Sequence, residues 1–278
     1  MLPGFVDPHN HLPFAGSREE EFALRILGTT YQELAARGMG IQTTVSATRL
    51  VPPLELKALC LERLNTMLLH GTTTAEAKSG YGLNLKDEIK QLEAVREADK
   101  EHPIDLVPTF MGAHEIPREY AEDRQAYISL LTDKIIPEIG QRKLAEFFDI
   151  FCEEGVYSIE ESRRLIRAAK AAGFRIKIHA DEFASLGGAQ LAAEEGAVSA
   201  EHLIAISEEG IASLAQSDTA AVLLSGVSFF LMQERKAPAR KLIDAGAAVA
   251  LATDFNPGSS MTESMFFIFQ LGVFTLGM

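Results

Sequence analysis

Two histidines separated by one residue, His9 and His11, follow a short apolar run near the start of the chain. In an extended strand the side chains alternate between faces, so these two imidazoles would point the same way. Two imidazoles on one face can bind one metal ion without moving the backbone. Such pairs also arise by chance in loops, so the pair indicates a metal site only if further ligands accompany it.

Further candidate ligands stand where other apolar runs end. His114, His179 and His202 lie at or beside the ends of three such runs, and Asp254 directly follows the run 247–253. A carboxylate in that position is costly to bury unless it is paired or bound to a metal ion. Taken alone, Asp254 could instead cap the turn that follows it. Beside the histidines, a metal ligand or proton acceptor is the better interpretation.

One combination of these residues gives a mixed nitrogen and oxygen site that suits zinc or a similar first-row ion. Its members are His9, His11, His179 and Asp254. A metal ion in a site with an open position lowers the pKa of water towards neutrality and so makes hydroxide available.

Two more polar residues are candidates for moving protons. Glu182 lies three residues after His179, where it could shuttle a proton or hold a ring N–H, although a solvated loop carboxylate is the alternative. His202 could orient a water molecule or contact an oxyanion, and the alternative is a core histidine bonded to a carbonyl.

The elements that must position these residues follow an alternation of strands and helices. After the opening run, strands are predicted at residues 72–77, 104–111, 147–152, 175–179, 198–203, 221–225 and 247–253. Eight buried strands, mostly followed by helices, predict an α/β fold, a (β/α)₈ barrel that forms one domain over residues 1–278. A doubly wound sheet is the alternative, but it needs a glycine-rich phosphate turn where this chain has histidines.

The barrel prediction explains where the histidines fall. Barrel active sites are built at the C-terminal ends of the strands, where five of the seven histidines are placed. His70 and His102 lie at the opposite end and are expected to be structural. Between the strands we expect a long polar connection over residues 12–51, a helical stretch over 119–136 and a helix with a capping box at Ser158.

Net charge, cysteine usage and the length of apolar runs indicate which partners and which compartment to expect. Lys and Arg number 26 against 39 Asp and Glu, which gives a net charge of −13 and disfavours nucleic acid or an anionic membrane as partner. Cys60 and Cys152 lack metal-type spacing and are expected to be buried, reduced thiols. The start of the chain does not resemble a signal peptide and no run is long enough to span a bilayer, so we expect a cytoplasmic protein.

The two ends predict a fragment of a longer chain. The first strand begins almost at the first residue, and the apolar segment 263–278 stops without a cap.

These residues resemble the amidohydrolase superfamily of metal-dependent hydrolases and, within it, the imidazolonepropionase family. The resemblance is carried by the segments 3–12, 14–22, 78–83, 179–182 and 252–259. It implies a barrel of the amidohydrolase type, here without the flanking β-sandwich segments of that family. It also implies a hydrolase acting on a C–N bond of a cyclic amide, with one zinc or iron ion per chain.

The resemblance further implies an acidic small-molecule substrate, 4-imidazolone-5-propanoate, hydrolysed to N-formimidoyl-L-glutamate in histidine degradation. Metal-activated water would attack the ring carbonyl carbon, and a homodimer is a further hypothesis. The implied metal ligands are again His9, His11, His179 and Asp254, and the implied catalytic groups are Glu182, His202 and Asp254. The implied substrate contacts are Arg18, Tyr81, His114, Glu182, Asn256, Gly258 and Ser259. For Arg18 the alternative is a surface ion pair with the acidic run Glu19 to Glu21.

Three alternatives stay open at this point. The first is a deaminase of a purine or pyrimidine ring in the same superfamily, for which Arg18 would have no carboxylate to bind. The second is a truncated barrel that binds metal without activity, and the third is a barrel whose histidines are only structural.

Overall fold

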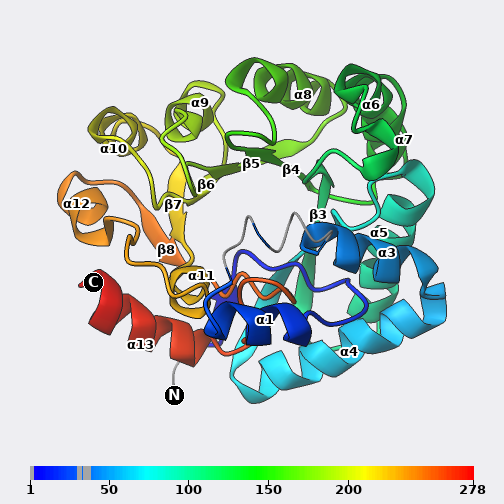
Figure 1. The fold of residues 1–278 in the computed structure, drawn as a ribbon, viewed down its shortest axis with the longest axis horizontal. Coiled ribbons are helices and arrows are strands. Elements are labelled where there is room, and N and C mark those ends of the chain that lie inside the picture. The colour runs from blue at the N-terminus through cyan, green and yellow to red at the C-terminus, as the bar shows by residue number, and fades with distance from the viewer. Residues whose placement is uncertain (1–2, 30–32, 34–38) are drawn as a thin grey trace.

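The computed structural model describes residues 3–29, 33 and 39–278, and eight parallel strands form its centre (Figure 1). They are hydrogen-bonded in chain order from β1 to β8, which confirms the (β/α)₈ barrel. The strands are β1 (Phe5–Asp7), β2 (Thr72–Lys78), β3 (Asp105–Ala113), β4 (Phe147–Cys152), β5 (Arg175–Ala180), β6 (Ser199–His202), β7 (Ala220–Leu223) and β8 (Val249–Leu251).

Helices surround the strands on the outside of the barrel (Figure 1). They are α1 (Glu19–Ile26), α3 (Ile41–Leu50), α4 (Pro53–Leu69), α5 (Leu85–Asp99), α6 (Arg124–Leu130), α7 (Ile136–Arg142), α8 (Ile159–Ala171), α9 (Gly188–Glu194), α10 (Glu208–Ala215), α11 (Ser225–Phe230), α12 (Ala239–Asp244) and α13 (Met265–Leu276). The buried face of α4 consists of Leu56, Cys60, Leu64 and Met67. One large cluster of buried apolar side chains joins most of these helices to the sheet, with α1 and α11 outside it.

The connection over residues 12–51 is more ordered than predicted, because its described part contains α1 and α3. The acidic run Glu19 to Glu21 forms the first turn of α1, where negative charge stabilises the helix N-terminus. In α3, Thr44, Val45 and Thr48 supply a buried stripe. Polar composition concealed both helices.

The predicted helix over residues 119–136 is interrupted. A short 3₁₀ turn (Arg118–Tyr120), α6, a π-helical turn (Leu131–Ile135) and α7 follow one another. Strand bounds differ from the prediction by one or two residues at most ends, and β8 is shorter, at three residues.

The barrel closes at its C-terminal rim. Asn10 and Phe255 form a parallel bridge, the Asp254 N–H donates to the His9 carbonyl at 2.9 Å, and the His11 N–H donates to the Phe255 carbonyl at 2.9 Å. Below them, Asp7 accepts hydrogen bonds from the backbone and hydroxyl of Thr253, at 3.0 and 2.6 Å. The segment that carries two candidate ligands therefore also joins the first strand to the last.

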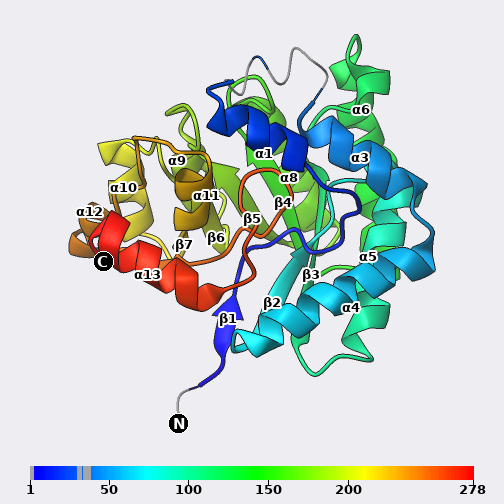
Figure 2. The ribbon, with the colours of Figure 1, turned by 60° about the horizontal axis from the view of Figure 1, so that its bottom comes forward.

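The two ends of the barrel differ in what lies over them. Figure 2 shows α1 and α3 at the end opposite the N-terminus, which is the end where the strands finish. The candidate residues at the strand ends thus lie beneath these two helices.

Loss of the predicted capping box at α8 should weaken the fold without touching the rim. The Ser158 hydroxyl accepts from the Glu161 N–H at 3.2 Å, and the Glu161 carboxylate accepts from the Ser158 N–H at 3.0 Å. Ser158→Ala should lower the free energy of unfolding by about 1 kcal/mol in denaturant titrations. Ser213→Ala, which removes a hydroxyl inside α10, is the control and should stay within about 0.5 kcal/mol of wild type. Equal losses in both variants would contradict the capping role.

Candidate active site at the barrel rim

The structure places all five rim histidines and Asp254 at strand ends. His114 directly follows β3, His179 lies near the end of β5, His202 ends β6, and Asp254 follows β8. β1 ends earlier than the pattern indicated, at Asp7, so His9 and His11 lie in the segment after the strand. Both rings still face the same group of side chains.

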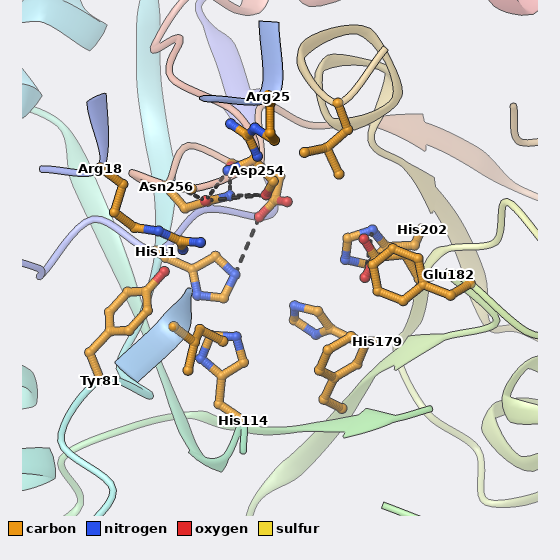
Figure 3. Close-up of a pocket in the computed structure, with 16 residues that line it drawn as sticks. His11, Arg18, Arg25, Tyr81, His114, His179, Glu182, His202, Asp254 and Asn256 are labelled. Atoms are coloured by element: carbon orange, nitrogen blue, oxygen red, sulfur yellow. Dashed lines mark hydrogen bonds and ion pairs between the residues drawn. The ribbon is translucent and has the colours of Figure 1, made fainter. Parts of the chain in front are cut away.

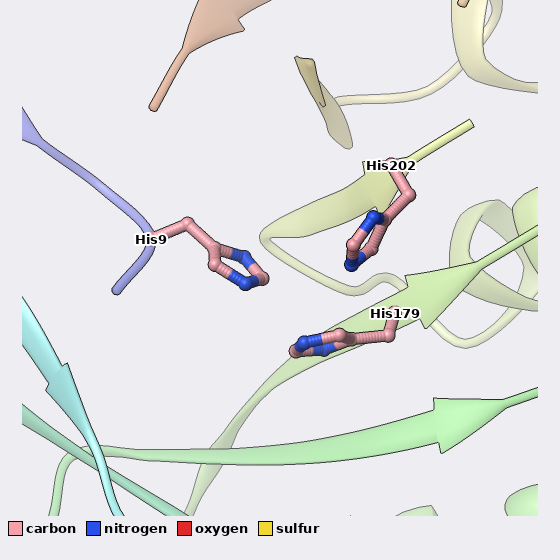
Figure 4. Close-up of side chains that lie close together, drawn as sticks. All are labelled: His9, His179 and His202. Carbon is pink, nitrogen blue, oxygen red and sulfur yellow. The ribbon is translucent and has the colours of Figure 1, made fainter. Parts of the chain in front are cut away.

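The four predicted ligands and His202 form two overlapping groups that could hold a metal ion. His9, His11 and Asp254 make one group, and His9, His179 and His202 make the other. Figure 4 shows the three histidines of the second group converging from separate segments. His9 belongs to both groups and is therefore the central donor.

The distances within the first group suit a cation. The Nε2 atoms of His9 and His11 lie 3.2 and 3.3 Å from the same Asp254 oxygen, Oδ1. His9 Nε2 and this oxygen are buried and make no hydrogen bond within the described part of the chain. Buried polar atoms are normally satisfied, so a metal ion between them would supply the missing partner. The donor set fits the group that the sequence predicts.

Burial and neighbouring charges separate the ionisation states of these groups. Although burial alone would lower it, the Glu201 carboxylate raises the pKa of His9 to about 9. Burial lowers the pKa of His11 and holds the pKa values of His179 and His202 well below the usual range. Burial acts to raise the pKa of Asp254, yet His9 and His11 hold it well below its ordinary value. The carboxylate is therefore ionised and most of the rings are neutral.

Two site residues adopt a backbone conformation that side chains rarely take. His202 has a φ of 72° and Asp254 a φ of 48°, both in the left-handed region. Such strain persists only where surrounding contacts enforce it, and it concentrates at functional sites. Here it turns both side chains towards the group of donors at the rim.

The predicted residues line one cavity, shown in Figure 3. Every predicted metal, catalytic and substrate residue contributes to its wall except His9, which lies buried behind it. In Figure 3, Arg18 and Tyr81 lie on one side of His11, and Glu182 and His202 lie on the other. The sequence-based assignment therefore brings together groups from both ends of the chain.

Arg18 enters the cavity in a fixed orientation. Its Nε and Nη2 atoms donate to Glu21 Oε2 at 2.9 and 2.6 Å, and Glu21 Oε1 accepts from the Gly40 N–H at 2.8 Å. A Cβ atom at Gly258 would lie 2.0 Å from Arg18 Nη1, so a larger residue there would displace this guanidinium from its present position. Glu21 occupies the Nε–Nη2 edge, so the fork that the guanidinium can direct at an anionic group is the edge between Nη1 and Nη2.

Three rings form the wall beside Arg18. His11 stacks on His114 with centroids 5.1 Å apart, and Tyr81 lies 5.4 Å from His114. The Nδ1 of His114 donates to the Gly80 carbonyl at 3.0 Å, since a carbonyl can only accept. Because burial keeps the pKa of His114 well below its usual value, its Nε2 is a hydrogen-bond acceptor.

Glu182 is held with its carboxyl group buried. Glu153 accepts hydrogen bonds from the backbone N–H groups of residues 182, 183 and 184, which fixes the loop after β5. Burial, with repulsion from Asp254, raises the pKa of Glu182 well above its ordinary value. Its Oε2 lies 3.6 Å from His202 Nδ1. Glu182 is therefore a protonated acid facing an ionised Asp254.

The turn after β8 is shaped by Asn256. Its side-chain oxygen accepts from the N–H groups of Gly258 and Ser259, both at 2.8 Å, and its amide donates to the Asp254 carbonyl at 2.7 Å. These bonds hold the predicted substrate contacts of this turn next to Arg18.

Sequence reasoning missed several residues that build the site. Arg25 and Phe151 also line the cavity. The spacing of Arg18, Glu21 and Arg25 fits one face of a helix, a signal that was lost by treating the segment as a loop. Glu88 accepts three backbone N–H bonds from residues 80, 82 and 83 and thereby shapes the loop that carries Tyr81. No local sequence pattern predicts this contact between Glu88 and the backbone of residues 80–83.

The residues predicted to be structural lie away from the cavity. His70 follows α4, and His102 accepts from the Ile104 N–H through Nδ1 at 3.2 Å. Cys60 and Cys152 are buried free thiols, as predicted, and burial raises the pKa of each to about 12.

The sequence model of the amidohydrolase family matches residues 1–273. The chain belongs to this family. Membership agrees with the barrel and with the donor groups at its rim, and together they support a divalent metal ion as cofactor. Among the described helices, none combines the length and the apolar character needed to cross a membrane.

Curated relatives within the amidohydrolases share about half of the residues. An imidazolonepropionase of Symbiobacterium thermophilum is 54% identical over 279 residues, covering 100% of this chain and 66% of the relative. An imidazolonepropionase of Brevibacillus brevis is 52% identical over 278 residues, covering 100% and 65%. The chain therefore spans about two thirds of the length of these curated relatives.

Solved structures show the same fold at low identity. A 5-methylcytosine deaminase of Klebsiella pneumoniae with 5-fluorocytosine has a TM-score of 0.74 at 17% identity, covering 99% of this chain and 69% of that one. An adenosine deaminase of Xanthomonas campestris with bound zinc has a TM-score of 0.66 at 17% identity, covering 99% and 60%. At this identity the likeness concerns the fold alone.

The raised pKa of Glu182 predicts a pH-dependent stability. The unfolded group titrates near 4.5, so above that pH the folded metal-free protein retains a proton that the unfolded chain has lost. The free energy of unfolding should therefore fall as pH rises, by up to about 1.4 kcal/mol per pH unit for one proton. The glutamine in Glu182→Gln cannot titrate, so the unfolding free energy of this variant should increasingly exceed that of the wild type as pH rises.

Denaturant titrations of the two metal-free proteins between about pH 5 and pH 8 measure this difference, since one titrating group changes the slope. A difference in unfolding free energy that stays constant with pH would show that Glu182 is not protonated in the folded protein.

Proposed function

We propose that this protein hydrolyses 4-imidazolone-5-propanoate to N-formimidoyl-L-glutamate, with one zinc or iron ion per chain. The single observation that carries the proposal is the cavity in which the directed Arg18 guanidinium and the metal-type donors share one wall. Imidazolonepropionases at 50–54% identity across the chain support this substrate.

The cavity offers a place for each part of such a substrate. Arg18 binds the propionate carboxylate through its fork. The ring lies between the wall of His11, His114 and Tyr81 and the acid Glu182. A zinc or iron ion held by His9, His11, His179 and Asp254 would polarise the carbonyl and make hydroxide available at neutral pH.

The protein's own residues then handle the protons. Ionised Asp254 accepts a proton from the attacking water, and neutral His202 orients that water. As the bond between the carbonyl carbon and the ring nitrogen breaks, protonated Glu182 gives its proton to that nitrogen. The water oxygen stays on the carbonyl carbon, which becomes the new carboxylate of the product.

The deaminase alternative shares the metal donors and Glu182 but gives Arg18 no anionic partner besides Glu21. The placement of Arg18 inside the cavity, with its side chain 7% exposed, therefore favours an acidic substrate. Cytoplasmic location, a homodimer and the absence of nucleic-acid or membrane partners stay predictions.

Removal and restoration of the metal test the reaction directly. Chelation should abolish formation of N-formimidoyl-L-glutamate, and one equivalent of Zn²⁺ or Fe²⁺ per chain should restore it. The measurement is product formation beside elemental analysis of the purified protein. Bound metal without product would support the inactive barrel, and absence of both binding and product would support structural histidines.

Truncation of Arg18 should separate substrate binding from chemistry. Arg18→Met should raise the KM for imidazolonepropanoate about 10- to 100-fold, the loss expected for one charged hydrogen-bonded contact, with a smaller effect on kcat. Arg18→Lys keeps the positive charge but loses the planar guanidinium, so its KM should lie between that of the wild type and that of Arg18→Met. Arg25→Met changes another cationic residue of the cavity wall and serves as the control. An unchanged KM in Arg18→Met would contradict the assigned substrate.

A further inference from the structure

A cluster of buried charges lies inside the barrel behind the metal donors. It consists of two lysines and three carboxylates from β2, β4, β5 and β6, namely Glu76, Lys78, Asp149, Lys177 and Glu201. Lys78, Asp149 and Glu201 have no solvent exposure. Barrel interiors are usually filled with branched apolar side chains, so this cluster requires a physical explanation.

Lys78 is the centre of the cluster. Its Nζ lies 2.5 Å from Asp149 Oδ2, 2.8 Å from Glu76 Oε2 and 3.1 Å from Glu201 Oε2. Lys177 joins two of the same carboxylates, at 2.8 Å from Glu76 Oε1 and 2.9 Å from Glu201 Oε1. The two ammonium groups thus fix three carboxylates on three different strands.

Two of these carboxylates also contact predicted metal ligands. Glu201 Oε2 lies 2.5 Å from His9 Nδ1, and Asp149 Oδ2 lies 3.0 Å from His179 Nδ1. In both cases the oxygen that meets the histidine is the oxygen that meets Lys78. Glu76 is arranged differently, because its oxygens contact the two lysines and the Thr109 hydroxyl.

We propose that Asp149 and Glu201, held in place by Lys78, are positioning residues that determine which ring nitrogen of His179 and His9 can bind the metal. The contacts are ion-pair distances rather than aligned hydrogen bonds. A carboxylate can only accept a proton, so its position beside Nδ1 favours the tautomer with the proton on that atom. The Nε2 atom of each ring then keeps its lone pair for the metal. One ammonium group thereby couples the orientation of two ligands from separate segments.

The role of Lys78 explains why a lysine occupies the barrel axis. A buried cation that contacts three carboxylates offsets their mutual repulsion and holds them at fixed separations. Removing it would leave three buried anions without their shared partner, which is strongly destabilising. Variants of the carboxylates are therefore the better test.

The experiment compares three single substitutions of similar size in the metal-free protein. Glu201→Gln and Asp149→Asn each replace a carboxylate that is ion-paired with a histidine. Glu76→Gln replaces one that, among the described residues, forms ion pairs with the two lysines and a hydrogen bond with Thr109 but no ion pair with a histidine. Each variant removes one buried negative charge beside Lys78, so all three should show a lowered Tm. Zinc affinity is measured by competition with a chelator.

Zinc affinity should fall about 10- to 100-fold in Glu201→Gln and Asp149→Asn, the range typical for groups that orient a metal ligand. It should stay close to the wild-type value in Glu76→Gln despite the lower Tm. The visible absorption of bound Co²⁺ should change in the first two variants and not in the third. If either Glu201→Gln or Asp149→Asn fails to fold, the zinc affinity of the other variant is compared with that of Glu76→Gln, and this comparison tests the proposal.

Two outcomes would overturn the proposal. One is wild-type zinc affinity in a folded Glu201→Gln or Asp149→Asn protein, and the other is an equal loss in Glu76→Gln. The inference rests on the metal centre of the proposed function, but different results refute the metal centre and the positioning role. A wild-type protein that binds no zinc refutes the metal centre, whereas equal affinities among variants of a zinc-binding wild type refute only the positioning role.

Discussion

Charges that are buried inside the barrel must meet opposite charges, and much of this structure follows from that requirement. Lys78 and Lys177 lie among three carboxylates, and all five side chains are buried. Separating any of these partners would leave an uncompensated charge, so the positions of β2, β4, β5 and β6 are fixed relative to one another. His9 and His179 contact Glu201 and Asp149, so the fixed positions of these carboxylates also constrain the positions of the two rings.

The rim combines closure of the fold with construction of the site. β1 is only three residues long, and its extension through Asn10 completes the ring against Phe255. Because His9 and His11 flank Asn10, the hydrogen bonds that close the barrel also hold the backbone of two candidate metal ligands. Buried carboxylates then fix the loops above, as Glu88 does for the Tyr81 loop and Glu153 for the Glu182 loop.

Sequence periodicity was sufficient for the barrel and for the rim, because buried strands and the residues at their ends follow local rules. It failed for α1 and α3, whose polar composition conceals a buried face. It also failed for the charged cluster, although Glu76 and Lys78 alternate along β2 as residues on one face of a strand must. The missing information is which faces meet across the barrel, and that depends on contacts between residues far apart in the chain.

The two carboxyl groups of the cavity are driven to opposite states by their surroundings. The neighbouring His9 and His11 keep Asp254 ionised, while burial and the charge of Asp254 itself keep Glu182 protonated. Sequence alone left open which of these groups accepts the first proton. An ionised carboxylate can accept one and a protonated carboxyl can only donate, so the electrostatics support Asp254 as the acceptor and Glu182 as the donor. Each state depends on the other, because neutralising Asp254 would remove part of what keeps Glu182 protonated.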